Sequence, residues 1–335
     1  MLTRLSFVFA LLLAFPGVAM AACAAAGAGL EKCTFVGGPH DARWYRVHVP
    51  ASGSGARPLV VVLHGAGTFE DNGAADMRTA SNMETYGDTL NGGNGMIIAY
   101  PWGGVVGWNA APEACAKFGS CLDDVAFINA VFVDIKARWS VDNSRVTLVG
   151  HSMGALTTYR FACQAGDNPH ATQLWIVSGG LSNGEVSICN SSTRTPLYIV
   201  NGMTDEFFGY TGGNPSGLFW VSQPVGQAAY QTISRVARGG TTNDSTLWQG
   251  TKLGAGVDAD GECTTTSFNS ETKILVWTFG AGFTTPYLVA SDSCHSIAGM
   301  GHRWPGYAGN YGTGIQVAVY TISNTILEFT ITPPF

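Results

Sequence analysis

Runs of apolar residues alternate with segments of helical period along most of the chain. Continuous β-branched runs are typical of strands buried on both faces of a parallel sheet. The pattern predicts strands at residues 44–50, 59–63, 96–100, 145–149, 173–178 and 197–200, and helices at 123–139, 154–164 and 315–327. Asp123 and Asp124 mark the start of the first helix, because carboxylates favour the positive end of a helix dipole.

This alternation predicts an α/β fold, with a doubly wound, mostly parallel sheet flanked by helices. Between Pro101 and Cys121 we expect a loop rich in Trp, Gly and Pro. Neither a linker rich in Pro, Ser or Thr nor an internal repeat divides the chain. We therefore expect one domain over residues 22–335.

The first 22 residues have the pattern of an export signal. Arg4 precedes an apolar run over residues 5–15, and small residues then lead to Ala19-Met20-Ala21. The apolar run is shorter than the roughly 20 residues that span a bilayer. The pattern predicts a signal peptide over residues 1–21, removed after Ala21 or Ala22, and a secreted protein. A lipoprotein anchored through Cys23 is the alternative.

Cysteine usage agrees with export. Eight cysteines follow the predicted signal peptide, and an even number suits an oxidising compartment. Pairing neighbours closes the shortest loops and predicts disulfides 23–33, 115–121, 163–189 and 263–294. The sequence has no C-x-x-C pair and no two histidines at ligand spacing, so we expect no metal site.

Composition excludes several classes of function. The 335 residues include 17 Phe, 11 Tyr and 9 Trp, and the formal net charge is only −6, which argues against a disordered chain. The sequence has no cluster of Lys and Arg, the feature that would attract nucleic acid or an anionic membrane surface. We expect neither partner, and we expect a monomer.

The segment Gly150-His151-Ser152-Met153-Gly154 lies between a predicted buried strand and a predicted helix. In this context G-x-S-x-G forms a strained turn that presents the serine hydroxyl above the sheet. The motif predicts Ser152 as a nucleophile and the backbone N–H of Met153 as one donor to an oxyanion. A structural serine in a tight turn is the alternative.

A serine nucleophile needs a histidine to take its proton and a carboxylate to orient that histidine. In this fold the acid and the base follow the serine in that order. Asp205 comes just after the predicted strand at residues 197–200 and is the expected acid, with Glu206 and Asp292 as alternatives. The expected base is His302, in a glycine-flanked loop, rather than His295 beside a cysteine.

The loop His64-Gly65-Ala66-Gly67 follows the first central strand. That loop supplies the second oxyanion donor in comparable hydrolases, and the N–H of Ala66 is the candidate. A glycine-rich turn without a role is the alternative. Neither G-x-x-x-x-G-K-[ST] nor G-x-G-x-x-G occurs at a strand–helix junction, so we do not expect nucleotide binding.

Taken in order, these segments resemble the secreted polyhydroxybutyrate depolymerase and feruloyl esterase group of the α/β-hydrolases. The segments that carry the resemblance are Arg46-Val47-His48-Val49-Pro50, Pro58-Leu59-Val60-Val61-Val62-Leu63-His64-Gly65, Tyr100-Pro101, Gly107-Trp108-Asn109, Asp123-Asp124-Val125-Ala126-Phe127-Ile128, Gly150-His151-Ser152-Met153-Gly154 and Gly301-His302-Arg303-Trp304-Pro305-Gly306. The resemblance implies a carboxylic ester hydrolase without metal or organic cofactor, with Ser152, Asp205 and His302 as its triad. The chain departs from the group at Ala155, where a glycine is common.

The predicted function is a serine esterase acting on poly- or oligo(3-hydroxyalkanoate) or related esters. Feruloyl or acetylxylan esterase activity on plant cell-wall polysaccharide is the alternative. A peptidase of the same fold and a non-catalytic secreted binding protein are the other candidates. Trp108 and Trp304 adjoin motif residues and are the predicted substrate contacts, because aromatic walls suit an apolar acyl group.

Overall fold

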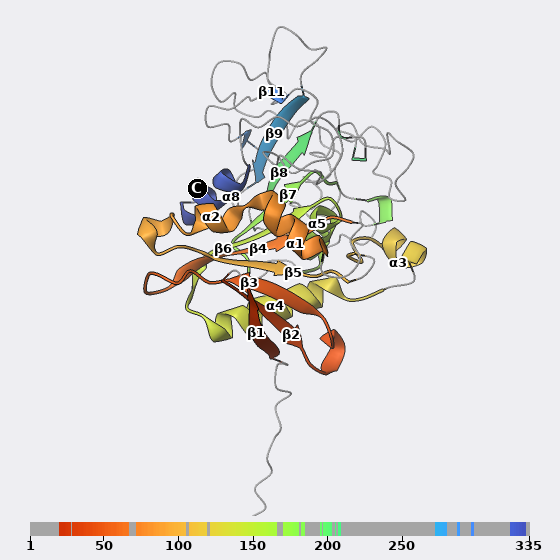
Figure 1. Ribbon diagram of the computed structural model, residues 1–335. Helices are drawn as coiled ribbons and strands as arrows, with labels where there is room; N and C mark the ends of the chain where they lie inside the picture. The colour runs from red at the N-terminus through yellow and green to blue at the C-terminus, as the bar shows by residue number, and fades with distance from the viewer. Residues whose placement is uncertain are drawn as a thin grey trace, which may run out of the picture.

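One eleven-stranded sheet organises the part of the chain that the computed structural model describes (Figure 1). The structure describes residues 20–27, 29–66, 72–104, 107–118, 121–165, 170–180, 182–184, 195, 197–202, 205, 207–208, 272–279, 287–288, 296–297 and 322–332. The strands are β1 (Ala21–Gly27), β2 (Leu30–Phe35), β3 (Trp44–His48), β4 (Arg57–Leu63), β5 (Ile97–Pro101), β6 (Val141–His151), β7 (Gln173–Val177), β8 (Leu197–Gly202), β9 (Thr272–Phe279), β10 (Tyr287–Leu288) and β11 (Ser296–Ile297). The helices are α1 (Asn72–Ser81), α2 (Met83–Gly87), α3 (Pro112–Phe118), α4 (Asp124–Arg138), α5 (Met153–Ala165) and α8 (Ile322–Ile331), with short 3-10 turns at Gly38–His40 and Asn91–Gly93.

The centre of the sheet is parallel and its edges are antiparallel. The strand order is β1-β2-β3-β5-β4-β6-β7-β8-β9-β10, with β11 paired to β9. The strands β5, β4, β6, β7 and β8 run parallel to their neighbours within this set. The edge strands β1 to β3 and β9 to β11 pair antiparallel. A mixed sheet with a parallel centre, flanked by helices and with a serine turn after β6, is the α/β-hydrolase fold that the sequence predicted. The antiparallel pairings at both edges make the described sheet less parallel than expected.

Apolar side chains of β4 pack on both faces of the sheet. Leu59, Val61 and Leu63 belong to the core under α4 and α5, whereas Val60 and Val62 belong to the core under α1, α2 and α8. Successive side chains of a strand point to opposite faces, so an uninterrupted apolar run requires both faces to be covered. Figure 1 shows α1, α2 and α8 together beside the sheet.

The predicted C-terminal helix is present as α8, described from Ile322. A fully buried polar network joins this helix to the sheet. The Thr147 and Thr330 hydroxyls lie 2.6 Å apart, and the Gln173 amide donates to both, at 2.6 and 3.1 Å. Buried polar groups need such partners, so the network fixes where the helix docks.

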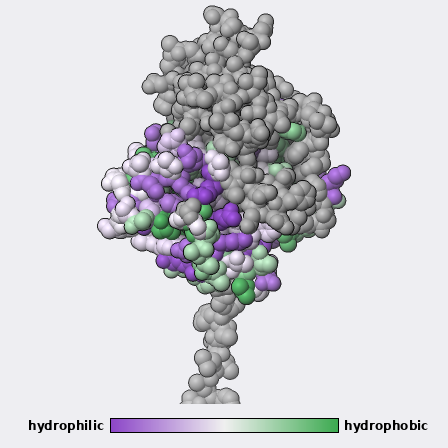
Figure 2. All heavy atoms as spheres, viewed as in Figure 1, coloured by the Kyte–Doolittle hydropathy of each residue, from purple (hydrophilic) through white to green (hydrophobic). Residues whose placement is uncertain are grey.

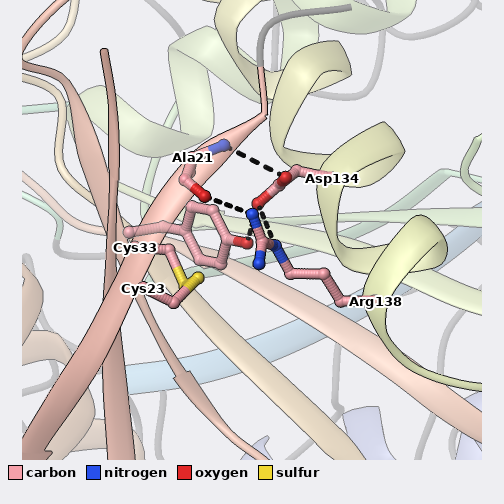
Figure 3. Close-up of a disulfide and its surroundings, with 6 residues drawn as sticks. Ala21, Cys23, Cys33, Asp134 and Arg138 are labelled. Atoms are coloured by element: carbon pink, nitrogen blue, oxygen red, sulfur yellow. Dashed lines mark hydrogen bonds and ion pairs between the residues drawn. A yellow bond between two sulfur atoms is a disulfide. The ribbon is translucent and has the colours of Figure 1, made fainter.

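An N-terminal hairpin, β1 and β2, extends the sheet beyond β3. Cys23 and Cys33 face each other across this hairpin and form a disulfide (Figure 3). Cys115–Cys121 is also a disulfide, so two of the four predicted pairings are confirmed. The side chains of the other two predicted pairs lie outside the described part of the chain.

Asp134 of α4 anchors the start of this hairpin (Figure 3). Its fully buried carboxylate accepts the Ala21 N–H at 3.2 Å, the Arg138 Nε–H at 2.9 Å and the Tyr45 hydroxyl. Arg138 also donates to the Ala21 carbonyl. Ala21 is both the first residue of β1 and the last residue of the predicted signal peptide. The point of cleavage stays a prediction.

The described surface mixes polar and apolar side chains (Figure 2). Within the described residues, the large apolar side chains that are exposed are Met20, Val36 and Leu122. None of the helices that the structure describes is long and apolar enough to cross a membrane.

Candidate active site

Ser152 lies in the turn between β6 and α5, where the sequence predicted a strained elbow. Its φ is +56°, in the left-handed region that a serine rarely adopts. The Ser152 N–H donates to the Val177 carbonyl of β7 at 3.1 Å, which helps to hold the turn. Backbone strain of this kind persists only where the surrounding structure enforces it, and it is concentrated at functional sites.

The two glycines of the motif are required by the packing of the elbow. A Cβ on Gly150 would lie 2.0 Å from the Gly154 carbonyl oxygen. A Cβ on Gly154 would lie 2.5 Å from the Leu63 carbonyl oxygen of the neighbouring strand β4. Both contacts are with backbone, which cannot rotate away, so only glycine fits at either position.

Ala155, where the related group commonly has glycine, is accommodated by a glycine elsewhere. A Cβ on Gly179 would lie 2.3 Å from the Ala155 Cβ. The methyl group of Ala155 therefore occupies space that a side chain at position 179 would need. The departure from the group's motif leaves the elbow intact.

The predicted oxyanion loop lies beside this elbow. It follows β4, which pairs in parallel with β6 so that Leu63 is opposite Gly150. Gly107 shows how close the two segments are. A Cβ on Gly107 would lie 3.5 Å from the Met153 side chain and 3.8 Å from the Ala66 Cα. The Met153 side chain and the Ala66 Cα thus both lie near Gly107, and the oxyanion role of their N–H groups stays a prediction.

Gly107 is a site residue to which the sequence analysis gave no function. Its φ is +86°, a conformation that favours glycine. A side chain here would also meet both oxyanion segments. Gly107-Trp108-Asn109 had carried part of the family resemblance, but nothing in the sequence shows which residues this turn touches.

The His64 imidazole connects the oxyanion loop to residue 103. It is fully buried, its Nδ1–H donates to the Gly65 carbonyl at 2.7 Å, and its Nε2 accepts the Gly103 N–H at 3.0 Å. Burial lowers the pKa of His64 to about 4. The ring is therefore neutral at pH 7, with its proton on Nδ1.

Lowering the pH is expected to destabilise the protein through His64. An unfolded histidine has a pKa near 6.5, so between about pH 6.5 and 4 the unfolded chain binds a proton that the folded chain does not. Stability therefore rises with pH across this window and is lost as the pH falls. Because of His64, we expect the free energy of unfolding to fall by about 2–3 kcal/mol between pH 7 and pH 4.5. Denaturant unfolding at both pH values measures this change.

The control is His64→Gln, whose amide does not titrate. His40 and His170 also have lowered pKa values, mainly because of burial, and they add to the wild-type slope. The contribution of His64 is therefore the difference between wild type and His64→Gln in how far the free energy of unfolding falls over this pH range. Equal losses of unfolding free energy in the two proteins would contradict the prediction.

Trp108 is buried, with 1% of its surface exposed, and its indole Nε1–H donates to the His64 carbonyl at 2.8 Å. Its ring also covers Gly103, where a Cβ would lie 2.7 Å away. The structure therefore places Trp108 behind the oxyanion loop. Its predicted contact with substrate stays a prediction. Trp304, the other predicted substrate contact, lies outside the described residues.

Asp205, the predicted acid, is buried beyond the carboxyl end of β8. Its Oδ1 accepts the N–H groups of Phe207 and Phe208, at 2.9 and 2.8 Å. Strands β6, β7 and β8 are parallel neighbours, so Asp205 follows its strand at the same edge of the sheet as Ser152. His302, the predicted base, lies outside the described residues, as do the alternatives Glu206, Asp292 and His295.

One group of potential metal ligands occurs within the described part of the chain. Cys23, Glu31 and Cys33 lie close enough together to share an ion. The two cysteines are joined in a disulfide and so offer no thiolate.

Comparisons with known proteins find esterases. No family model matches the chain. It is 33% identical over 129 residues to "Putative esterase NocK" of Nocardia uniformis subsp. tsuyamanensis, a match that spans 37% of this chain and 35% of NocK. Among solved structures, it is similar to an acetyl xylan esterase from Aspergillus awamori, with a TM-score of 0.47 and 16% identity over 82% of this chain and 93% of that one. It is also similar to LpqC, a poly(3-hydroxybutyrate) depolymerase from Bordetella parapertussis, with a TM-score of 0.34 and 20% identity over 46% and 53% of the chains.

Proposed function

We propose that this protein is a secreted serine esterase that works through an acyl-enzyme on Ser152. The observation that carries the proposal is the elbow itself. Ser152 has a left-handed backbone between a buried parallel strand and a helix, and the predicted oxyanion loop lies beside it. The similarity of part of the chain to NocK supports the assignment.

In this proposal the Ser152 hydroxyl attacks the ester carbonyl while His302 takes its proton. Negative charge develops on the carbonyl oxygen, and the N–H groups of Met153 and Ala66 stabilise it. The intermediate collapses, and His302 returns the proton to the departing alcohol. Water, activated by the same histidine, then hydrolyses the acyl-serine, and Asp205 holds the imidazole in the productive orientation.

We further propose that the substrates are poly- or oligo(3-hydroxyalkanoates) or related esters, on the basis of the family resemblance. Acylated plant polysaccharide is the second substrate class, supported by the same resemblance. A peptidase uses the same triad chemistry, and a non-catalytic binding protein would use none of it.

The test offers the purified mature protein hydroxybutyrate oligomers, methyl ferulate and acetylated xylan in parallel. A fluorophosphonate, which labels activated serines covalently, is applied separately, and the labelled peptide is identified by mass spectrometry. We expect labelling at Ser152 and cleavage of one substrate far faster than the others. A protein that the phosphonate leaves unmodified and that cleaves none of the esters would overturn the proposal in favour of a binding function.

A further inference from the structure

A buried ion pair lies behind the candidate active site. Asp124, the first residue of α4, is 1% exposed, and its Oδ1 lies 2.6 Å from Nη2 of Arg43. The Arg43 guanidinium stands over the Phe127 ring, 3.6 Å from its centroid. Burying two charges costs free energy that their attraction repays only in part, so such a pair adds little to stability. Stability alone therefore does not explain why Arg43 and Asp124 are buried here.

The second oxygen of Asp124 holds the loop that carries Trp108. Oδ2 accepts the backbone N–H of Asn109 at 2.5 Å. The Asn109 side-chain amide donates to the Leu122 carbonyl at 2.8 Å, and its backbone carbonyl accepts from Arg160 Nη1 at 2.6 Å. Helix α4, the loop just before it and helix α5 thus each hold Asn109.

The two residues before Asn109, Gly107 and Trp108, lie next to the oxyanion segments. Trp108 donates its indole N–H to the His64 carbonyl, two residues before Ala66. A Cβ on Gly107 would lie 3.8 Å from the Ala66 Cα and 3.5 Å from the Met153 side chain. Residues 107–109 therefore connect Asp124 to the His64 carbonyl by hydrogen bonds, and they place Gly107 near Ala66 and the Met153 side chain.

We propose that Trp108 and Asp124 are positioning residues, which hold the loop at residues 64–66 so that the Ala66 N–H faces the oxyanion. The inference rests on the proposed function of Ser152. An oxyanion donor has to lie about 2.7–3.1 Å from the developing charge. A displacement of about 1 Å can cost on the order of 100-fold in rate. This loop needs such support, because the described residues 64–66 belong to neither a helix nor a strand.

The first test is Trp108→Phe, which keeps an aromatic ring but removes the N–H that His64 accepts. With p-nitrophenyl acetate we expect kcat to fall about 10–100-fold and KM to change less than about threefold, because the lost stabilisation belongs to the transition state. The affinity for a trifluoromethyl ketone, which forms a tetrahedral adduct with the serine, is expected to fall by the same factor as kcat/KM.

The matched control is Trp175→Phe, which removes the same atoms from a fully buried tryptophan in the core on the other face of the sheet. We expect its kcat to stay within about threefold of wild type, although its melting temperature falls as far as that of Trp108→Phe. Equal losses of kcat in the two variants would show a general packing effect and overturn the proposal. An increase in KM at unchanged kcat would make Trp108 a substrate contact instead.

Asp124→Asn is the second variant, because it keeps the shape of the side chain and removes its charge. We expect Asp124→Asn to lower kcat, as Trp108→Phe does. The double variant is expected to be no more than about threefold slower than the slower of the two single variants. Fully multiplicative losses would mean that the two residues act independently and would overturn the connection between them.

Phosphonate labelling separates this inference from the proposed function. A wild-type protein that is labelled at Ser152, with Trp108→Phe as active as Trp175→Phe, overturns the positioning role alone. A wild-type protein that is not labelled and cleaves none of the esters overturns the esterase assignment, and the positioning role with it.

Discussion

Ser152→Ala is expected to lower kcat for p-nitrophenyl acetate by about 10⁴–10⁶-fold while the protein stays folded. The substitution removes one oxygen atom, and that atom is the proposed nucleophile. The elbow around it is held by backbone contacts and by two glycines, none of which the substitution touches. The measurement is initial rate against substrate concentration, with the thermal unfolding midpoint measured on the same samples.

Two further variants make this result specific. Ser81→Ala removes the hydroxyl of another buried serine, at the end of α1, and is expected to leave kcat unchanged. Ser152→Gly is expected to be as inactive as Ser152→Ala but at least as stable, because glycine adopts a φ of +56° without steric cost. More than about one per cent of wild-type kcat in Ser152→Ala would exclude this serine as the nucleophile.

The largest loss of stability is expected from Gly150→Ala. The added methyl group would have to lie 2.0 Å from the Gly154 carbonyl oxygen, which is backbone at the start of α5. Either β6 or α5 must shift, and both are packed in the core. We expect a loss of about 3 kcal/mol or more in the free energy of unfolding, measured with denaturant, together with a loss of activity in the protein that remains folded.

Gly87→Ala is the matched control, because Gly87 is also buried and ends a helix. A methyl group there would lie 2.9 Å from Cδ1 of Ile98, the far end of a flexible side chain that can rotate away. Its expected effect is within about 1 kcal/mol of zero, since alanine also favours the helix. If the two variants unfolded at the same denaturant concentration, steric exclusion at the elbow would not be the reason for glycine at position 150.

Much of the fold could be predicted because the central strands carry their own signal. An uninterrupted apolar run, as in β4, is compatible with few environments other than a sheet covered on both faces. The serine turn also carries a local signal, since strand, G-x-S-x-G and helix follow one another directly. Cys23 with Cys33 and Cys115 with Cys121 close short loops, so that pairing neighbours was correct for both.

Other elements had no such signal. The antiparallel strand β9 pairs with β8 although its residues are far along the chain, and its partner cannot be inferred from a local pattern. Strand β1 is mostly exposed and consists of Ala, Cys and Gly, without a β-branched or aromatic residue, so it carries no strand signal. Helix α3 lies where the sequence indicated only an irregular loop rich in Trp, Gly and Pro, because a helix of seven residues is too short to show a periodic pattern.

The elbow, the central strands and the candidate nucleophile could be predicted from the sequence, because residues adjacent in the chain carry those features. The contacts that support the oxyanion loop became known only from the three-dimensional fold. The Trp108 indole reaches a carbonyl 44 residues earlier, and the Gly103 N–H reaches an imidazole 39 residues earlier. Asp124 joins Arg43 to Asn109, the residue next to Trp108, from a third part of the chain. Such contacts depend on how strands and loops from distant segments pack together, and packing of that kind leaves no periodicity in the sequence.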